Sequence, residues 1–145
     1  MASYAKKIGD AIVAKILNVQ GSPVTVKQRK DNSILGRETP PIVVVTIESE
    51  QKVGRAFEGV IFKEYAIIVG FFRKCLADIS TELDITPEFI LRTKQALDIT
   101  AFVSVPEVWD VDLADNPEWE HQDFGKGMEV SRFGLLVKTS EPQNG

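Results

Sequence analysis

Hydrophobic residues near the start of the chain recur with the period of an α-helix. Five of them, at spacings of four, four, four and three, fall on one helical face: Tyr4, Ile8, Ile12, Ile16 and Val19. Ser3 suits the N-cap position, and Gly21 followed by Pro23 supplies a stop signal. The pattern predicts an amphipathic helix over residues 4–19.

Strand-like patterns come next. Residues 24–29 alternate as a short strand, and residues 42–49 begin with four consecutive β-branched apolar residues. This run predicts a strand that is covered on both faces at its start. Residues 62–72 predict a second long strand. The intervening residues 50–61 predict a connection too long for a tight hairpin but compatible with an antiparallel pair joined by an extended loop.

The second half of the chain returns to a helical pattern before ending in strands. Apolar spacings of three and four allow a short helix around Leu76, Ile79 and Leu83. Residues 86–97 predict a further helix, because Thr86 suits the N-cap and Pro87 the first helical position. Two strand regions complete the pattern: residues 101–113, broken at Pro106, and residues 128–138.

This order of elements predicts an α+β fold. We expect a mostly antiparallel sheet of about five strands, with the N-terminal helix and one or two further helices packed on one face. A chain of 145 residues fits one domain and can bury a core without a disulfide or a metal. We assign residues 1–138 to this domain and the polar residues 139–145 to a flexible C-terminal tail.

The net charge of −4 is unevenly distributed. Residues 1–30 contain six basic residues and one acid, whereas residues 107–123 contain seven acids and no lysine or arginine. The two regions are either separate solvated surfaces or surfaces that meet between subunits, where charge complementarity would fix the register. The basic set is small and not interleaved with aromatic residues, so we expect no sequence-specific nucleic-acid binding.

The chain shows no pattern of secretion or membrane insertion. Its first residues lack an apolar core, and no window is apolar for the 18 or so residues of a membrane span. The single cysteine, Cys75, cannot form an internal disulfide. We therefore expect a cytoplasmic or virion location and no membrane partner.

The residues capable of chemistry form no recognisable catalytic, cofactor or metal site. Four residues that could bind a metal recur every three positions, namely Asp112, Asp115, Glu118 and His121. Pro117 interrupts the run, so we expect a solvated acidic loop rather than a metal site. The glycines at 125 and 127 lack the spacing of a phosphate-binding loop. One histidine also leaves little room for a triad. We therefore expect the chain to have no enzymatic activity and to bind neither a cofactor nor a metal.

Arginine and aromatic residues outside the predicted core are candidates for an interface, where such side chains are enriched. The candidates are Arg29, Arg37, Arg55, Phe57, Trp109 and Trp119. Packing in the core or anchoring of the acidic loop is the alternative role for the two tryptophans, and Arg55 and Phe57 carry the same ambiguity between packing and an interface.

Five stretches, roughly in the first half of the chain, carry a resemblance to a known family. They begin with the amphipathic helix at Ile8–Val19, followed by an arginine-containing loop that ends in prolines, Arg37–Pro41. A valine-rich strand at Ile42–Ile47, a second loop arginine, Arg55, and a Tyr-x-Ile-x-Val strand at Tyr65–Val69 complete the set. In this order they resemble the tail-terminator and minor tail proteins of the tailed-phage neck. The resemblance implies a non-enzymatic subunit of a homo-oligomeric ring, a hexamer, that caps the tail tube and contacts other neck or tail proteins.

Two other classes of function remain open. The chain could be a small-molecule or peptide-binding α+β module that uses residues 30–41 and 114–127 as pocket walls, which a deep apolar pocket between sheet and helix would favour. It could also be an enzyme that uses carboxylates such as Glu64 or Glu107 as acid and base. That class requires two carboxylates facing one cleft.

Overall fold

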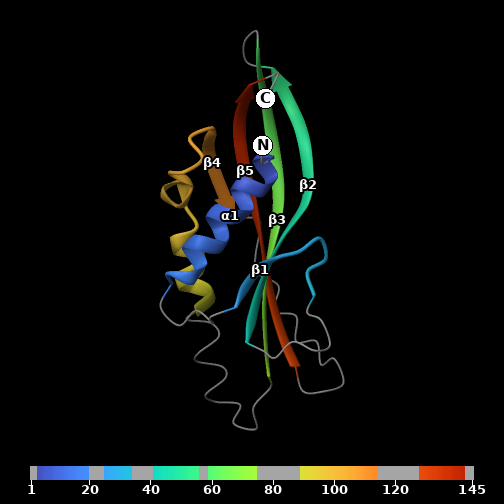
Figure 1. Cartoon of the computed structure of the whole chain (residues 1–145), viewed down its shortest axis with the longest axis vertical. Coiled ribbons are helices and arrows are strands. Elements are labelled where there is room, and N and C mark those ends of the chain that lie inside the picture. The colour runs from blue at the N-terminus through green and yellow to red at the C-terminus, as the bar shows by residue number, and fades with distance from the viewer. Residues whose placement is uncertain are drawn as a thin grey trace.

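The computed structural model describes residues 3–19, 25–33, 41–55, 59–74, 89–113 and 128–142. They form a five-stranded sheet with helices on one face (Figure 1). This arrangement confirms the predicted α+β class. The elements in chain order are α1 (Tyr4–Leu17), β1 (Val26–Gln28), β2 (Ile42–Arg55), β3 (Val60–Lys74), helical residues 89–96, the 3₁₀ helix η1 (Ile99–Phe102), β4 (Val108–Leu113) and β5 (Met128–Pro142).

The N-terminal helix confirms the predicted amphipathic pattern and ends two residues earlier than expected, at Leu17. The Ser3 hydroxyl caps its start by accepting a hydrogen bond from the backbone N–H of Lys6 at 3.1 Å. Three isoleucines of the predicted stripe are fully buried against the sheet: Ile8, Ile12 and Ile16. Each such side chain stabilises the fold by about 1.5–3 kcal/mol through burial.

A glycine in the middle of α1 lets the helix lie close to β1. A Cβ atom on Gly9 would stand 2.0 Å from Oε1 of Gln28 in β1. The Gln28 side chain instead lies along the helix and donates to Oδ1 of Asp10 at 2.5 Å. The close approach of β1 therefore explains why a glycine occupies this position, although glycine destabilises a helix interior by about 1 kcal/mol relative to alanine.

The strands are ordered β1-β2-β3-β5-β4 across the sheet. β1 and β2 are parallel, and the other three neighbouring pairs are antiparallel. The centre of the sheet is β3, which pairs with β2 on one side and with β5 along its whole length on the other. The other four strands therefore take their positions from β3.

The prediction of a long connection between the two central strands was wrong. β2 continues to Arg55 and β3 already begins at Val60, so only residues 56–59 lie between the two strands. Pairing continues through two register shifts, between Ile47 and Ser49 and between Lys52 and Gly54. The polar residues of this region look like a loop because neither face is deeply buried there, yet backbone pairing does not require apolar side chains.

Two other boundaries also differ from the sequence prediction. The strand region expected over residues 101–113 divides into the end of η1 and the shorter strand β4, which begins only at Val108. The C-terminal strand is longer than expected and runs to Pro142, so residues 139–142 belong to the sheet rather than to a flexible tail. Thr139 and Glu141 are buried there because hydrogen bonds, rather than apolar surface, hold them.

The main core lies between the helices and one face of the sheet, which we call the helix face. Figure 1 shows α1 and the segment from residue 89 to η1 on this same side. The buried side chains of the central strand alternate along it: Tyr65, Ile67, Val69 and Phe71. The opposite face carries a smaller buried cluster, made of Ile42, Val44, Phe72 and Val130. The start of β2 is thus covered on both faces, as predicted.

One polar side chain, Asn32, lies against this opposite face. Its amide nitrogen is 2.8 Å from the carbonyl oxygen of Val44 and 3.4 Å from that of Ile68. Its amide oxygen accepts a hydrogen bond from Nε of Arg132 at 3.1 Å. The side chain lies directly over Gly70, where a Cβ atom would come within 2.0 Å of the amide oxygen.

Several predictions concern residues outside the described part of the chain. These are the short helix around Leu76–Leu83, the start of the next helix at Thr86 and Pro87, and most of the loops at 30–41 and 114–127. The described residues 89–96 confirm the body of the helix predicted at 86–97. No helix in the described ranges has both the length and the apolar composition to cross a membrane.

We expect Gly70→Ala to lower the free energy of unfolding by about 1–3 kcal/mol, because the new methyl group overlaps Asn32 and disrupts its hydrogen bonds. Urea denaturation of the purified protein measures this change. The same substitution in an Asn32→Ala background is the control and should cost clearly less. Equal costs in the two backgrounds would show that Asn32 is not the obstacle.

Candidate interaction surfaces

The structure places two of the six predicted interface side chains, at opposite edges of the sheet. Arg29 follows β1 at one edge, and Trp109 lies in β4 at the other. Arg55 is the last residue of β2, and its side chain is outside the described part of the chain. The other three residues also lie outside it: Arg37, Phe57 and Trp119.

Basic residues gather at the edge formed by β1, and we call Lys27, Arg29 and Lys30 the basic edge. Lys27 and Lys30 are exposed. The backbone N–H of Arg29 donates to the carbonyl oxygen of Val45 at 3.0 Å, and its guanidinium donates to that of Ser33 at 3.2 Å. These contacts hold positive charge beside the outermost strand.

Beyond β1, the same edge exposes part of β2. β1 pairs only with Val43–Val45, and no strand of the described chain lies outside the later residues of β2. A surface hollow of about 380 Å³ lies at this corner, lined by Ala5, Lys6, Gln28, Arg29, Lys30, Val45 and Ile47. Farther along β2, the exposed side chains carry both signs, namely Glu48, Glu50 and Lys52.

The opposite edge is formed by β4, and we call Trp109, Asp110 and Asp112 the acidic edge. The Trp109 side chain is 52% exposed, with its ring centroid 5.9 Å from that of Phe62. The Lys138 ammonium lies 3.5 Å from a carboxylate oxygen of Asp110 and 3.8 Å from one of Asp112. One lysine between two carboxylates leaves this group with a net negative charge.

The strand order separates the two charged groups by the width of the sheet. β1 and β4 are the first and last strands, with β2, β3 and β5 between them. The uneven charge of the sequence therefore becomes two oppositely charged edges in the described structure. Both remaining interpretations, solvated surfaces and contacts between subunits, are compatible with this placement.

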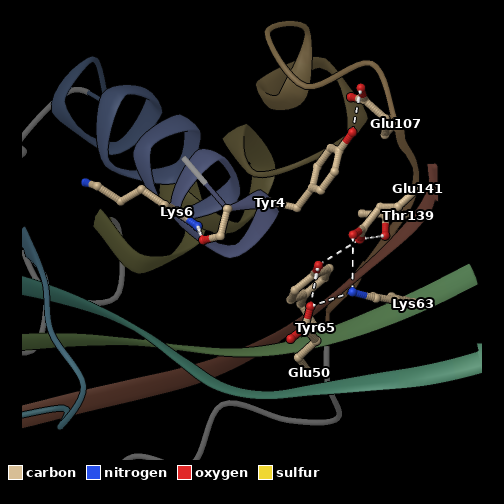
Figure 2. A network of polar contacts seen from close by, with 9 residues as sticks. Tyr4, Lys6, Glu50, Lys63, Tyr65, Glu107, Thr139 and Glu141 are labelled. Atoms are coloured by element: carbon tan, nitrogen blue, oxygen red, sulfur yellow. Dashed lines mark hydrogen bonds and ion pairs between the residues drawn. The ribbon is translucent and has the colours of Figure 1, made fainter. Parts of the chain in front are cut away.

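A polar network that runs from buried Glu141 and Tyr65 to exposed Glu50 lies on the helix face near the end of β5 (Figure 2). The Tyr65 hydroxyl lies 2.7 Å from Oε2 of Glu141 and 2.9 Å from Oε1 of Glu50. A phenol has a single hydrogen, so it donates to one carboxylate at a time. The Thr139 hydroxyl also donates to Glu141, and the Lys63 ammonium lies 3.1 Å from Glu50 and 3.5 Å from Glu141.

The environment of this network shifts the pKa values of three groups. Burial, followed by the hydrogen bonds to Glu141 and Glu50, strongly raises the pKa of the Tyr65 hydroxyl. The hydrogen bond from Lys63 lowers the pKa of Glu50, and the same bond raises the pKa of Lys63. The network therefore favours ionised Glu50 and Lys63 beside a neutral phenol. None of its residues lines the hollow at the β1 corner.

The two carboxylates considered as an acid and a base do not face one cleft. Glu107 accepts a hydrogen bond from the Tyr4 hydroxyl at 3.2 Å and thereby ties the first turn of α1 to the residue before β4. Glu64 is the neighbour of buried Tyr65 in β3, so its side chain points to the opposite face of the sheet. The pair that does converge, Glu50 and Glu141, was not anticipated.

The other chemical candidates find little structural support. Asp112 is the only member of the spaced acidic set in the described chain, and the described residues contain no group of three or more potential metal ligands. Cys75 and the glycines at 125 and 127 lie outside the described part. The structure therefore offers no described arrangement to which a metal or phosphate role can be attached.

The space between α1 and the sheet is filled by side chains, including the fully buried Ile8, Ile12 and Ile16. A second hollow, of about 400 Å³, lies at the surface near the end of α1, lined by Lys15, Asn18, Val19, Arg92, Gln95 and Ala96. Neither hollow is the deep pocket between sheet and helix that a small-molecule module would favour.

No protein-family model matches the chain, and no curated protein matches it in sequence.

We expect Tyr65→Phe to lower the free energy of unfolding by about 1–3 kcal/mol at pH 7, because Glu141 stays buried with one donor fewer. The raised pKa of Tyr65 contributes stability that is complete below the unfolded value of about 10 and is lost as the pH rises toward the folded value. Urea titrations from pH 7 to 11 should therefore show a shallower alkaline loss in the variant. Part of the alkaline loss of stability should remain in the variant, because the pKa of Lys63 is also raised in the folded protein.

The substitution Glu50→Gln tests how the same network contributes to stability at acid pH. The lowered pKa of Glu50 contributes stability that is present above the unfolded value of about 4.3 and is lost as the pH falls through the folded value. The variant should lose less stability than the wild type between pH 5 and pH 3. Parallel acid curves for the two proteins would contradict this role of Glu50.

Proposed function

We propose that the chain is a structural assembly protein that forms a homo-oligomeric ring, as a tail-terminator-like subunit of a phage or prophage neck. One observation carries the proposal, namely that the sheet formed by the described residues ends in two strands whose exposed side chains have opposite charge, β1 and β4. A surface that is basic on one side of a molecule and acidic on the other is complementary to further copies of itself.

The placement of the charges favours one kind of symmetry. A two-fold dimer through either edge would bring like charges together, basic against basic or acidic against acidic. Head-to-tail contact brings the basic edge of one copy to the acidic edge of the next, and such contacts generate closed rings or open filaments. In a ring, every basic edge meets an acidic edge of a neighbouring copy.

The sequence resemblance supplies the biological context of the proposal. Three of the five matching stretches correspond to α1, the start of β2 and the middle of β3. Arg55, matched as a loop residue, instead ends β2, and Arg37–Pro41 lies outside the described residues except for Pro41. On this basis the ring contains six copies and caps the tail tube. It contacts other neck or tail proteins in the virion and carries out no catalysis.

A peptide-binding module is the second candidate, and the hollow at the β1 corner is the observation that favours it. The hollow adjoins the unpaired part of β2, where an extended peptide could add as a further strand. In that case the chain would remain a monomer on its own and assemble only around its ligand.

Multi-angle light scattering and negative-stain electron microscopy of the purified chain test the ring. We expect a concentration-dependent closed oligomer that weakens as salt is raised from 0.05 to 0.5 M, because added ions screen the charged edges. The oligomer should also bind to the ends of isolated tail tubes. A chain that remains a monomer at millimolar concentration and does not bind tail tubes would refute the proposal.

A further inference from the structure

The charged side chains of the two edges can be assigned to faces of the sheet, because successive side chains of a strand point to opposite faces. In β1, Val26 packs against the main core, so the exposed Lys27 points to the opposite face. In β4, Val111 packs against the same core, and Asp110 and Asp112 point to the opposite face beside Lys138. The basic and acidic side chains therefore share one face of the sheet.

The directions of the edge strands are also complementary. β2 is parallel to β1, β3 runs against β2, β5 runs against β3, and β4 runs against β5. It follows that β4 runs antiparallel to β1. Two copies placed side by side in the same orientation would bring these two strands together as an antiparallel pair, the more stable of the two ladder types.

We propose that β4 of one subunit pairs directly with the outer edge of β1 in the next subunit, which makes the sheet continuous around the ring. This inference rests on the proposed function and specifies its interface. On one face, Lys27 meets Asp110 and Asp112 of the neighbouring copy. On the helix face, Val26 meets Val111 and Leu113, so the 46%-exposed side chain of Leu113 becomes covered.

Charge distinguishes this pairing from a competing one with the open part of β2. The exposed side chains there carry both signs, with Lys52 beside Glu48 and Glu50, and the Lys63 ammonium already lies 3.1 Å from a carboxylate oxygen of Glu50. The outer edge of β1 carries Lys27 and is followed by Arg29 and Lys30. A second copy therefore fits β1 better than the rest of the same edge.

Charge reversal followed by rescue tests the pairing. We compare two charge-reversal variants: Lys27→Glu alone, and Asp110→Lys combined with Asp112→Lys. Each should raise the protein concentration needed for half-maximal ring assembly at least tenfold at 0.1 M salt. Combining all three substitutions should restore at least half of the lost assembly. Lys52→Glu, the same change of charge at an exposed position on the unpaired part of β2, is the matched control and should assemble like the wild type.

Cross-linking gives a readout that does not depend on charge or on the folding of the reversal variants. Val26→Cys and Leu113→Cys are introduced together in a Cys75→Ser chain, which leaves the new pair as the only thiols. Mild oxidation of the assembled protein should give a ladder of covalent oligomers up to the ring size. Either single variant should give dimers at most.

The outcomes separate this interface from the proposed function. Rescue together with a covalent ladder supports the β4–β1 pairing. A ring that forms without charge rescue and without the ladder overturns the pairing but leaves the ring intact as a function. A wild-type chain that never assembles overturns both.

Discussion

Backbone pairing of β3 on both sides is the constraint on which the rest of the structure depends. The strand pairs with β5 from Val60 to Lys74 and with β2 from Ile61 to Phe72. Because side chains alternate along a strand, this pairing assigns each residue of the three strands to the helix face or to the opposite face. A slip of one residue would exchange the two sets and place Glu64 where Tyr65 now lies.

Several features follow from this assignment without further assumptions. The alternate apolar residues of β2, β3 and β5 line the helix face, which α1 approaches over β1 and β2, and the polar network lies near the end of β5 on this same face. On the opposite face, Gly70 leaves the space that Asn32 occupies. In β4, a register shift between Val108 and Asp110 interrupts the alternation, and both Trp109 and Asp110 lie beside Lys138 of β5.

The sequence predicted those elements whose signal is local. The isoleucine stripe of α1 and the run of β-branched residues at the start of β2 each carry the period of their element over many residues, and both were correct. The end of β2 was missed because Lys52 and Gly54 resemble loop residues when read without β3 beside them. The buried end of β5 was missed for the same reason, since Glu141 is polar and its partner Tyr65 lies 76 residues away.

Of the candidate site, the sequence identified the charges but not their arrangement. Basic residues before position 30 and acidic residues after 107 are visible in the chain, whereas their separation to opposite edges depends on the strand order. That order inserts β5 between β3 and β4, and no local pattern encodes it. The same is true of Arg132, which reaches Asn32 across 100 residues.

The two edge strands of the described sheet, β1 and β4, are the basis of the proposed assembly. An unpaired edge strand is a site of uncontrolled association unless something covers it or blunts it. β2 is blunted by its bulges and by Glu48, Glu50 and Lys52, but β1 and β4 are short and have opposite charges instead. Opposite charges do not prevent the two edges from meeting. In the proposed assembly, they keep each edge from meeting its own kind and direct association into a head-to-tail order and, where the rotation closes, into a ring.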